Sequence, residues 1–520
     1  MLELLQMWAL VELLGLICVP LTFTVFRNLP DRGWAFTKAL GVALFSFCIW
    51  FPLICLRFLP FSQGLLAGIA LIFLGAGIVG WVRTHQAITK MVRLNRTYII
   101  ATEVIFLGMV FLLGWLRSFN PNIQSYEMFM DEGFIAAIMR SPHLPPNDMW
   151  FANYSINYYY YAHFTAASLG KLLGQSPSVL FNTGISMFFG LTAVNLFGVS
   201  CNIVAWARHL RHKEPEPTVT PEQAHPSMLK SIPYGLLSML MGVVLGNLAA
   251  TQQWWLNHGQ TVPFDWFDPS RVVPNTINEF PAFSFLLSCF HAHVLTLAFS
   301  ILAIGLAFNL LLEKDGKGLN AFGSGWRLVC SLVVSALVIG ELFAMNGWDY
   351  PTYLGLACVC IGLQQWQAYQ RRFETALLLD IFTACASLGA LSFLLFLPFY
   401  LSFVSPALGL GLVIGNDRTP LNEELLIYGL FAFIYISLLL MSAFIQPLSV
   451  RRDTQTTTPA FDMPILLWFG VLLVIDLLIL LLLPNSLTLV VFGNGALFGV
   501  WLMFHHLDDR AQAFTLFVGA

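Results

Sequence analysis

The feature that most constrains this chain is a succession of apolar stretches, most of them close to twenty residues long. A helix needs roughly 20 apolar residues to cross the hydrocarbon core of a bilayer, and the 520 residues contain thirteen stretches of this kind. Only 10% of the residues are charged and 58% are hydrophobic, a composition outside the range of water-soluble domains. The sequence therefore predicts an all-α polytopic integral membrane protein with about 13 to 14 transmembrane helices and long outer loops.

The predicted crossings are distributed along the whole chain. They run about Leu4–Phe26, Phe36–Leu56, Gly64–Val82, Tyr98–Trp115, Val179–Trp206, Ile232–Ala250, Phe283–Leu312, Leu328–Met345, Tyr350–Ala368, Ala376–Tyr400, Leu425–Leu448, Met463–Leu483 and Leu487–Phe504. A fourteenth stretch begins near Ala511 and ends with the chain at Ala520. Because it is too short to cross a bilayer, we expect either an interfacial helix or a chain cut within a helix.

The basic residues predict the orientation of these helices. When the connections are assigned alternately to the two sides of the membrane, 19 of the 25 Lys and Arg residues fall on one side and 6 on the other. Lys and Arg are retained on the cytoplasmic side, so the richer set is predicted inside, and the N-terminus and the long loops outside. The prediction is a multi-pass protein of the cell membrane with an extracytoplasmic active face. No basic surface suited to nucleic acid is apparent.

Three parts are expected along the chain. The first is an N-terminal four-helix membrane segment (1–116), and the second is a first outer loop (117–178). The third part (179–520) holds the remaining membrane helices, with outer loops near 251–282, 346–351 and 401–424. A Pro-rich stretch, Glu214–Pro226, is typical of a flexible linker.

The first outer loop carries the strongest candidate site. It contains the four carboxylates Glu127, Asp131, Glu132 and Asp148, followed by four consecutive tyrosines from Tyr158. In a chain with so few charges, this density of acids favours a catalytic or binding site. The alternative is a solvated loop whose acids keep it in water and whose tyrosines mark the membrane interface.

A second group of titratable residues surrounds the start of a later membrane helix. Glu279 precedes this helix, and His291 and His293 lie within its predicted range. Histidines at i and i+2 on an ideal helix are about 200° apart, which argues against both binding one ion. Imidazoles near the end of a membrane segment face a cavity or a partner, so the alternatives are a functional site and helix packing.

Other charged residues complete the candidate outer surface. Asp349 lies in the short turn Asn346–Pro351 between two predicted helices. Arg271 and Arg418 are two of the few cations predicted outside, and arginine is suited to bidentate binding of a lipid phosphate. Pairing of each arginine with a neighbouring acid is the equally weighted alternative.

Acids within the predicted membrane helices form a separate set. Because a charged side chain is costly in lipid, we expect these acids to face the interior of the helix bundle. Their spread over five helices does not predict a proton pathway. The set comprises Glu12, Glu103, Glu341, Asp380 and Asp476.

Several motifs together resemble a known family. These motifs are LPDRG (Leu29–Gly33), PPND.W (Pro145–Trp150), INYYYYAH (Ile156–His163), INEFPAFSFLL (Ile277–Leu287), HAH (His291–His293), WDYPTY (Trp348–Tyr353) and NDRTPLNEELLIYGLF (Asn416–Phe431), and they extend over most of the chain. Through them the chain resembles the uncharacterised membrane family DUF2298, also called the YYY membrane protein family after its tyrosine run. The chain departs from the usual family pattern at Met128, Met149 and Asn153, and family members tend to continue beyond its end.

The resemblance implies a function. The family looks like a distant branch of the GT-C glycosyltransferases, which take sugars from polyprenyl-phosphate carriers and place a catalytic acid in a long first outer loop. By this resemblance Asp131 would be the general base, with Glu127 and Glu132 as its catalytic neighbours. The acceptor and the sugar are not indicated by the sequence.

The implied substrate and metal sites draw on both outer loops. A divalent cation would be held by Asp131, His291 and His293. We expect Asp131 to lie within about 10 Å of His291 or His293, as a shared site requires. The residues implied in substrate binding are Asp148, Tyr158, Tyr159, His163, Arg271, Glu279, His291, His293, Asp349 and Arg418.

Two other functions remain open at this point. The chain could transport or flip a lipid-linked saccharide, with the buried acids as coupling groups, or it could be a non-catalytic structural subunit of an envelope assembly. The sequence contains no Walker loop, HExxH or GxSxG motif, which lowers the weight of nucleotide-driven transport and of the common membrane proteases.

Overall fold

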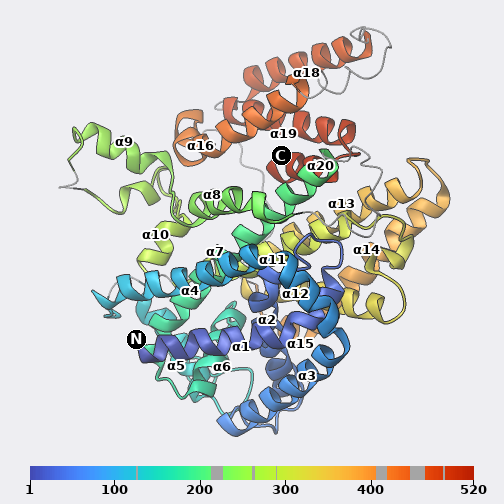
Figure 1. Cartoon of the computed structure of the whole chain (residues 1–520). Helices are drawn as coiled ribbons and strands as arrows, with labels where there is room; N and C mark the ends of the chain where they lie inside the picture. The colour runs from blue at the N-terminus through green and yellow to red at the C-terminus, as the bar shows by residue number, and fades with distance from the viewer. Residues whose placement is uncertain are drawn as a thin grey trace. The chain divides into compact units, whose positions relative to one another are not determined.

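The computed structural model describes residues 1–124, 127–211, 227–260, 264–288, 290–405, 418–445, 463–483 and 486–520 (Figure 1). The regular elements within these ranges are helices. The described residues contain no strand, only an isolated antiparallel bridge between Asn147 and Ser155. The predicted all-α fold is therefore confirmed. The predicted linker 214–226 lies outside the described residues.

The chain divides into two units, of which the first comprises Met1–Leu245 and Ser284–Ser405. It contains α1 (Leu2–Val25), η1 (Trp34–Phe36), α2 (Thr37–Cys55), α3 (Gln63–Leu94), α4 (Arg96–Ser118), α5 (Met128–Arg140), α6 (Tyr161–Leu173), α7 (Pro177–Arg211), η2 (Leu229–Ser231), α8 (Ile232–Val243), α11 (Ala292–Leu311), η4 (Gly318–Phe322), α12 (Trp326–Met345), α13 (Asp349–Ala368), α14 (Thr375–Leu395) and α15 (Leu397–Ser402).

The second unit comprises Gly246–Phe283 and Pro406–Ala520. It contains α9 (Leu248–Leu256), η3 (Asp268–Ser270), α16 (Leu421–Leu440), the π-helical turn η6 (Met441–Ile445), α18 (Met463–Leu482), α19 (Leu487–His505) and α20 (Arg510–Gly519). The short helix α10 (Pro281–Leu286) contains the boundary between the units.

Ten described helices are long and apolar enough to cross a membrane, or eleven if the broken pair Leu229–Val243 and Leu248–Leu256 forms one span. The thirteen predicted crossings are thus not all reproduced among the described residues. Helix α13 falls short of the hydropathy of the others because Asp349 and a group of glutamines interrupt its apolar face. In α18, the described apolar part is only Gly470–Leu482. The chain is a multi-pass membrane protein in either count.

Helix α11 forms the core of the first unit. In its most apolar window 89% of the residues are buried, whereas the corresponding share is 11% for α3. A helix that is apolar on all sides and buried on all sides must be surrounded by other helices. Helix α11 packs against α7, α12 and α13, which together surround it.

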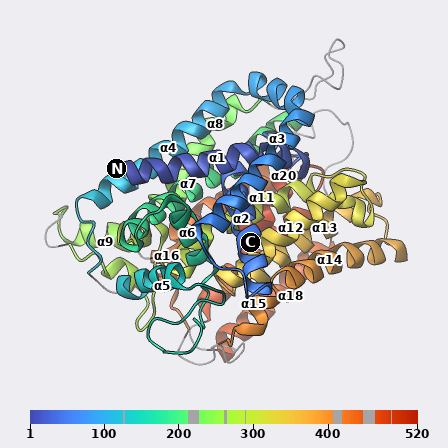
Figure 2. The ribbon, with the colours of Figure 1, turned by 90° about the horizontal axis from the view of Figure 1, so that it is seen from below.

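The first outer loop is partly helical. The predicted segment 117–178 contains α5 and α6, which lie side by side in both views (Figures 1 and 2). They pack against each other and against α7. Neither is long enough to count among the candidate membrane spans. Two of the four candidate acids, Asp131 and Glu132, therefore lie on a short helix, whereas Glu127 precedes this helix and Asp148 lies in the loop after it.

Helices α1 and α2 approach closely around a buried lysine. A Cβ atom at Gly41 would lie 2.6 Å from the Leu14 carbonyl oxygen, so only glycine permits this contact. Lys38 is 2% exposed, and its Nζ lies 3.3 Å from Glu12 and 2.6 Å from Glu103. Lys38 was counted among the 19 loop cations of the charge bias, but it is an interior residue of α2.

The intramembrane acids have different surroundings. Glu12 and Glu103 share Lys38, Asp380 accepts a hydrogen bond from Tyr369, and Asp476 accepts one from Asn494. In contrast, both carboxyl oxygens of Glu341 in α12 are buried with no hydrogen-bond partner among the described residues. Since such groups are rare and costly, Glu341 is the exceptional acid of this set.

Candidate functional site

The candidate site begins at the first turn of α5. Glu127 precedes the helix, and its carbonyl oxygen accepts the Asp131 N–H at 3.0 Å. Residues four apart lie on the same face of a helix, so both carboxylates point to one side. Asp131 is 1% exposed while the Glu127 side chain is 62% exposed. One acid is therefore held in the protein and the other reaches toward solvent.

His291 joins these two carboxylates. Its Nε2 lies 2.9 Å from Glu127 Oε2 and 3.7 Å from Asp131 Oδ2. The backbone N–H of the preceding residue, Phe290, donates to Asp131 Oδ2 at 3.0 Å. The expected proximity of Asp131 to a histidine of the HAH motif is confirmed. An imidazole in contact with two carboxylates can exchange a proton with either of them.

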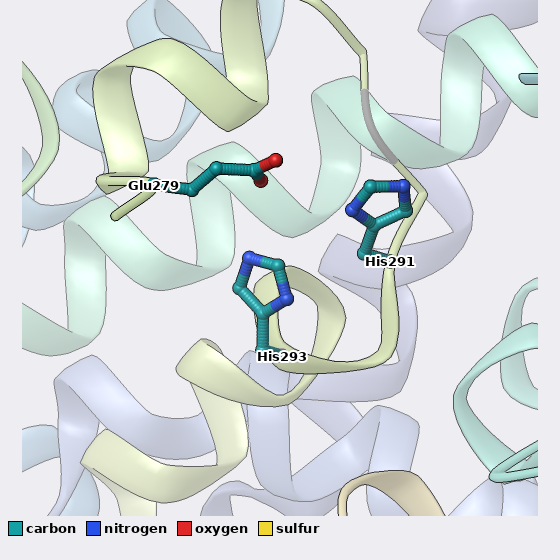
Figure 3. Close-up of side chains that lie close together, drawn as sticks. All are labelled: Glu279, His291 and His293. Atoms are coloured by element: carbon teal, nitrogen blue, oxygen red, sulfur yellow. The ribbon is translucent and has the colours of Figure 1, made fainter. Parts of the chain in front are cut away.

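The geometry of the two histidines differs from the helical arrangement assumed from the sequence. His291 is not in the helix but caps α11 with an extended backbone (φ −72°, ψ 149°). As a result its ring centroid lies 5.7 Å from that of His293, and one ring nitrogen of each lies within 4.8 Å of the other (Figure 3). The premise that both histidines lie in one helix was wrong, because α11 begins at Ala292 and the predicted crossing began at Phe283. Figure 3 also labels Glu279, which belongs to the second unit.

The loop after α5 is fixed by local contacts. Asp148 Oδ1 accepts the N–H groups of Trp150 and Phe151, both at 2.8 Å, which closes a turn. The Met149 side chain occupies the space beside Gly133, where a Cβ atom would clash with its sulfur. The observed contacts of Asp148 are thus those of a turn residue that positions the loop on α5.

The tyrosine run divides into two pairs. Tyr160 and Tyr161 are fully buried, and the Trp50 indole donates to the Tyr160 hydroxyl at 3.3 Å. Tyr158 stacks on Phe134 of α5, one turn after Asp131, with ring centroids 5.1 Å apart. Burial, followed by the charges of Asp131 and Glu127, raises the pKa of Tyr158 to about 12. Its phenol is therefore a hydrogen-bond donor at the edge of the site.

Tyr159 and His163 lie in different surroundings. Tyr159 packs against Phe403 at 5.0 Å and away from α5. His163 is fully buried among Phe134, Tyr158 and Phe290, with ring centroids 5.5, 6.2 and 5.6 Å from its own. Burial, followed by the charge of His291, lowers the pKa of His163 to about 3. His163 is therefore neutral near pH 7 and forms the wall behind the site.

The remaining predicted residues are less closely connected to Asp131. Glu132 is half-buried on the next position of α5. Asp349 begins α13, and its Oδ2 accepts the Ser300 hydroxyl of α11 at 3.2 Å. In the second unit, Arg271 donates to the carbonyl and hydroxyl oxygens of Ser270, both at 2.8 Å. Arg418 and Glu279 are half-buried residues of that same unit.

The donor set around His291 has the composition of a cation site. Glu127 and Asp131 offer carboxylate oxygens and His291 offers a ring nitrogen, with separations of 2.9 and 3.7 Å. Ligand atoms that share a metal ion with bonds of about 2.1 Å lie roughly 3 to 3.5 Å apart. The 2.9 Å separation between His291 and Glu127 is that of a direct carboxylate–imidazole contact. The ring nitrogens of His291 and His293, which lie within 4.8 Å of each other, could share a divalent cation.

Two contributors to the site were missed in the sequence. The Phe290 N–H is a backbone donor, which no residue type reveals. The packing of His163 behind Tyr158 depends on α6 folding back onto α5. The tyrosine run carries no local signal of this packing, because Tyr158 and His163 lie five positions apart and only Tyr161–His163 of that stretch are helical.

Comparison with known proteins identifies the family. No curated protein and no solved structure matches the chain. The model of the family DUF2298, described as an uncharacterized membrane protein, matches residues 44–520. This range contains both histidines of the HAH motif, the tyrosine run and the α5 acids. The chain therefore belongs to the DUF2298 family of multi-pass membrane proteins.

Proposed function

We propose that this protein is a GT-C-like glycosyltransferase that moves a sugar from a polyprenyl-phosphate carrier to an acceptor at the outer face of the membrane. The observation that carries the proposal is the buried Asp131 carboxylate in contact with His291 at the start of α5. An acid held at a helix start beside a histidine has the components of a general base. By the resemblance to the GT-C enzymes, the segment after the fourth membrane helix would be the outer loop that carries their catalytic acid.

The proposed reaction is a substitution at the anomeric carbon of the sugar. The acceptor oxygen forms a bond to this carbon as the bond from the carbon to the phosphate oxygen breaks. Asp131 takes the acceptor proton, and polyprenyl phosphate leaves with the bonding electrons. Glu127, with Glu132 on the same turn, orients the acceptor, and the Tyr158 phenol donates a hydrogen bond at the edge of the site.

The leaving phosphate needs positive charge nearby. Within the first unit His291 and His293 can supply it. A divalent cation, where present, would be held by Asp131, His291 and His293 and would neutralise the phosphate oxygens. Arg271 and Arg418 of the second unit remain proposed phosphate ligands.

Asp131→Asn tests this function. Asn keeps the size and one acceptor oxygen but cannot take a proton near neutral pH. Loss of a general base should lower turnover by about 10² to 10⁴, measured with purified protein in liposomes and radiolabelled polyprenyl-phosphate sugar. The matched control is Asp315→Asn, an exposed residue after α11, which should leave turnover unchanged. Full activity of Asp131→Asn would exclude Asp131 as the base.

Transport of a lipid-linked saccharide is the second candidate, favoured by one observation. Glu341 is a fully buried acid in α12 whose oxygens have no hydrogen-bond partner among the described residues. An acid of this kind can couple proton binding to movement. If the protein is a transporter, Glu341→Gln should abolish movement of the labelled lipid across the liposome membrane, and Asp131→Asn should not. Glu12 is a weaker choice because it is paired with Lys38.

A further inference from the structure

A second polar site lies in the first unit, at the other end of α11. It is a cavity of about 470 Å³ between the end of α1, the following turn, α3 and the start of α12. Four basic side chains line it, Arg27, Arg32, Lys90 and Arg327. In the sequence analysis these four residues contributed only to the count of basic residues on the predicted inner side.

The cations of this cavity are poorly balanced by acids. Glu313 is the one carboxylate in ion contact with them among the described residues, with its Oε2 2.7 Å from Arg27 Nη2. Arg27 also donates to the Phe322 carbonyl at 2.8 Å, so it is held from two sides. No described ion pair involves Arg32, Lys90 or Arg327. Like charges gathered without counter-charges repel one another, and an anion in the cavity would remove this cost.

The turn after α1 is built to present Arg32. Asp31 is fully buried and turned inward, where its oxygens accept the N–H groups of Gly33 and Ala35 and the Tyr98 hydroxyl. Arg32 itself has φ 56°, a left-handed conformation that is uncommon for residues other than glycine. Burial, followed by the charges of Arg327 and Arg27, lowers the pKa of Arg32. The motif LPDRG thus holds an arginine beside other cations at the cost of backbone strain.

The cavity has room and chemistry for a phosphate group. Its volume is within the range of small-molecule sites. The planar guanidinium groups of Arg27, Arg32 and Arg327 match phosphate oxygens in bidentate geometry. Apolar side chains, among them Phe23 and Leu94, line the same cavity. Polar and apolar walls side by side suit a lipid headgroup as well as a free anion.

We propose that this cavity is a binding site for a phosphate-bearing anion, either the headgroup of an anionic lipid or a soluble phosphate compound. The site is separate from the proposed sugar-transfer site and does not depend on it. On the predicted orientation it faces the cytoplasm. Arg32 and Arg327 are its principal ligands, since both carry a planar guanidinium group and neither is engaged by a described carboxylate; Arg32 also donates from Nη1 to the Arg27 carbonyl oxygen.

The test uses the purified full chain and two probes. Inorganic pyrophosphate binding is measured by calorimetry in neutral detergent, and phosphatidylglycerol binding by native mass spectrometry against phosphatidylcholine. Arg327→Gln should lower the affinity for the probe that binds by about tenfold, as expected for loss of one charge-assisted contact. Arg32→Gln should do the same. Arg327 is exposed and has no described hydrogen bond, so its substitution tests the site even if Arg32→Gln fails to fold.

Matched controls come from α3. Lys90 lines the cavity but Arg93, one turn further along the helix, does not. Lys90→Gln should weaken binding and Arg93→Gln should leave it unchanged. Binding of pyrophosphate alone would identify a soluble ligand, and binding of phosphatidylglycerol alone a lipid. Binding of neither probe, or equal losses in Arg93→Gln and Arg327→Gln, would overturn the proposal.

Discussion

The two ends of α11 carry opposite kinds of polar site. At its start, His291 contacts Glu127 and Asp131, so acids and a base meet within 4 Å. Beyond its end, four cations surround one cavity, and a single carboxylate is in ion contact with them within the described part of the chain. A helix of 20 residues is about 30 Å long, which keeps the two sites apart. The first has groups that can exchange a proton with each other, as a reaction requires. The second has an excess of positive charge among the described residues, which a bound anion would balance.

The largest effect is expected from a test of whether the two ends of α11 lie on opposite sides of the membrane. Cysteine at position 140, near the acidic end, should react fully with an impermeant thiol reagent added outside, and cysteine at position 90 should not react. The reason is the retention of basic residues in the cytoplasm. The exposed Cys48 and Cys55 are first replaced by Ser, and permeabilised membranes serve as the control for reactivity at 90. Labelling of both positions from outside would place the two ends of α11 on one face.

The next largest effect is expected at the acidic end. His291→Gln keeps a side-chain N–H donor but removes the group that can titrate between Glu127 and Asp131. We expect turnover of the labelled lipid-linked sugar to fall about 10²-fold, with the pH dependence of the rate altered as well. His85→Gln, an exposed histidine of α3, is the matched control. An unchanged pH profile in His291→Gln would show that the imidazole only packs there.

The free energy of unfolding should depend on pH through His163, which lies beside the acidic site at the start of α11. His163 has a pKa near 3 in the folded protein, below the ordinary value of about 6.5. The unfolded chain therefore binds more protons, and stability is lost as the pH falls below about 6.5. Between pH 7 and pH 5 this amounts to about 2 kcal/mol. Unfolding in detergent at both pH values should show the loss in the wild type and a smaller one in His163→Phe.

The control for this prediction is an exposed histidine on the same segment. His143→Phe should keep the full loss of stability, since its side chain is in solvent. An equal pH dependence in His163→Phe and the wild type would mean that His163 is protonated in the folded state.

The smallest effect is expected at the basic end. Glu313→Gln removes the carboxylate that pairs with Arg27. The side chain of Glu313 is 19% exposed and that of Arg27 is 14% exposed. We expect a loss of about 1.5 kcal/mol in stability, since the contact is charge-assisted but partly exposed. The same change should tighten pyrophosphate binding, because one more cation is left unbalanced. Asp315→Asn serves as the control. Weaker binding in Glu313→Gln would show that Glu313 positions the ligand contacts of Arg27.

Several local features could be predicted from the sequence because they depend on neighbours along the chain. The apolar stretches predicted helices, and the first four crossings correspond to α1–α4. The density of acids after α4 indicated where a site would lie. The helical form of α5 was missed, since a short helix with two acids in its first turns is difficult to distinguish from a polar loop.

Membership in DUF2298 was also visible in the sequence, through motifs such as the tyrosine run and HAH. The motif LPDRG was recognised, but its purpose was not. Its arginine acquires a role only when α3 and α12 bring Lys90 and Arg327 beside it.

Only the tertiary structure decided which polar groups meet. Asp131 and His291 are 160 positions apart, and Arg27 and Glu313 are 286 apart. No local pattern encodes such contacts, because they depend on how α11 packs among its neighbours. The same packing placed Lys38 between Glu12 and Glu103 and left Glu341 with no hydrogen-bond partner among the residues that the structure describes. The sequence by itself determined the helices and the chemical groups available, since hydrophobic length and composition are local properties. The structure decided the pairing of those groups, since the cost of a buried charge depends on what surrounds it.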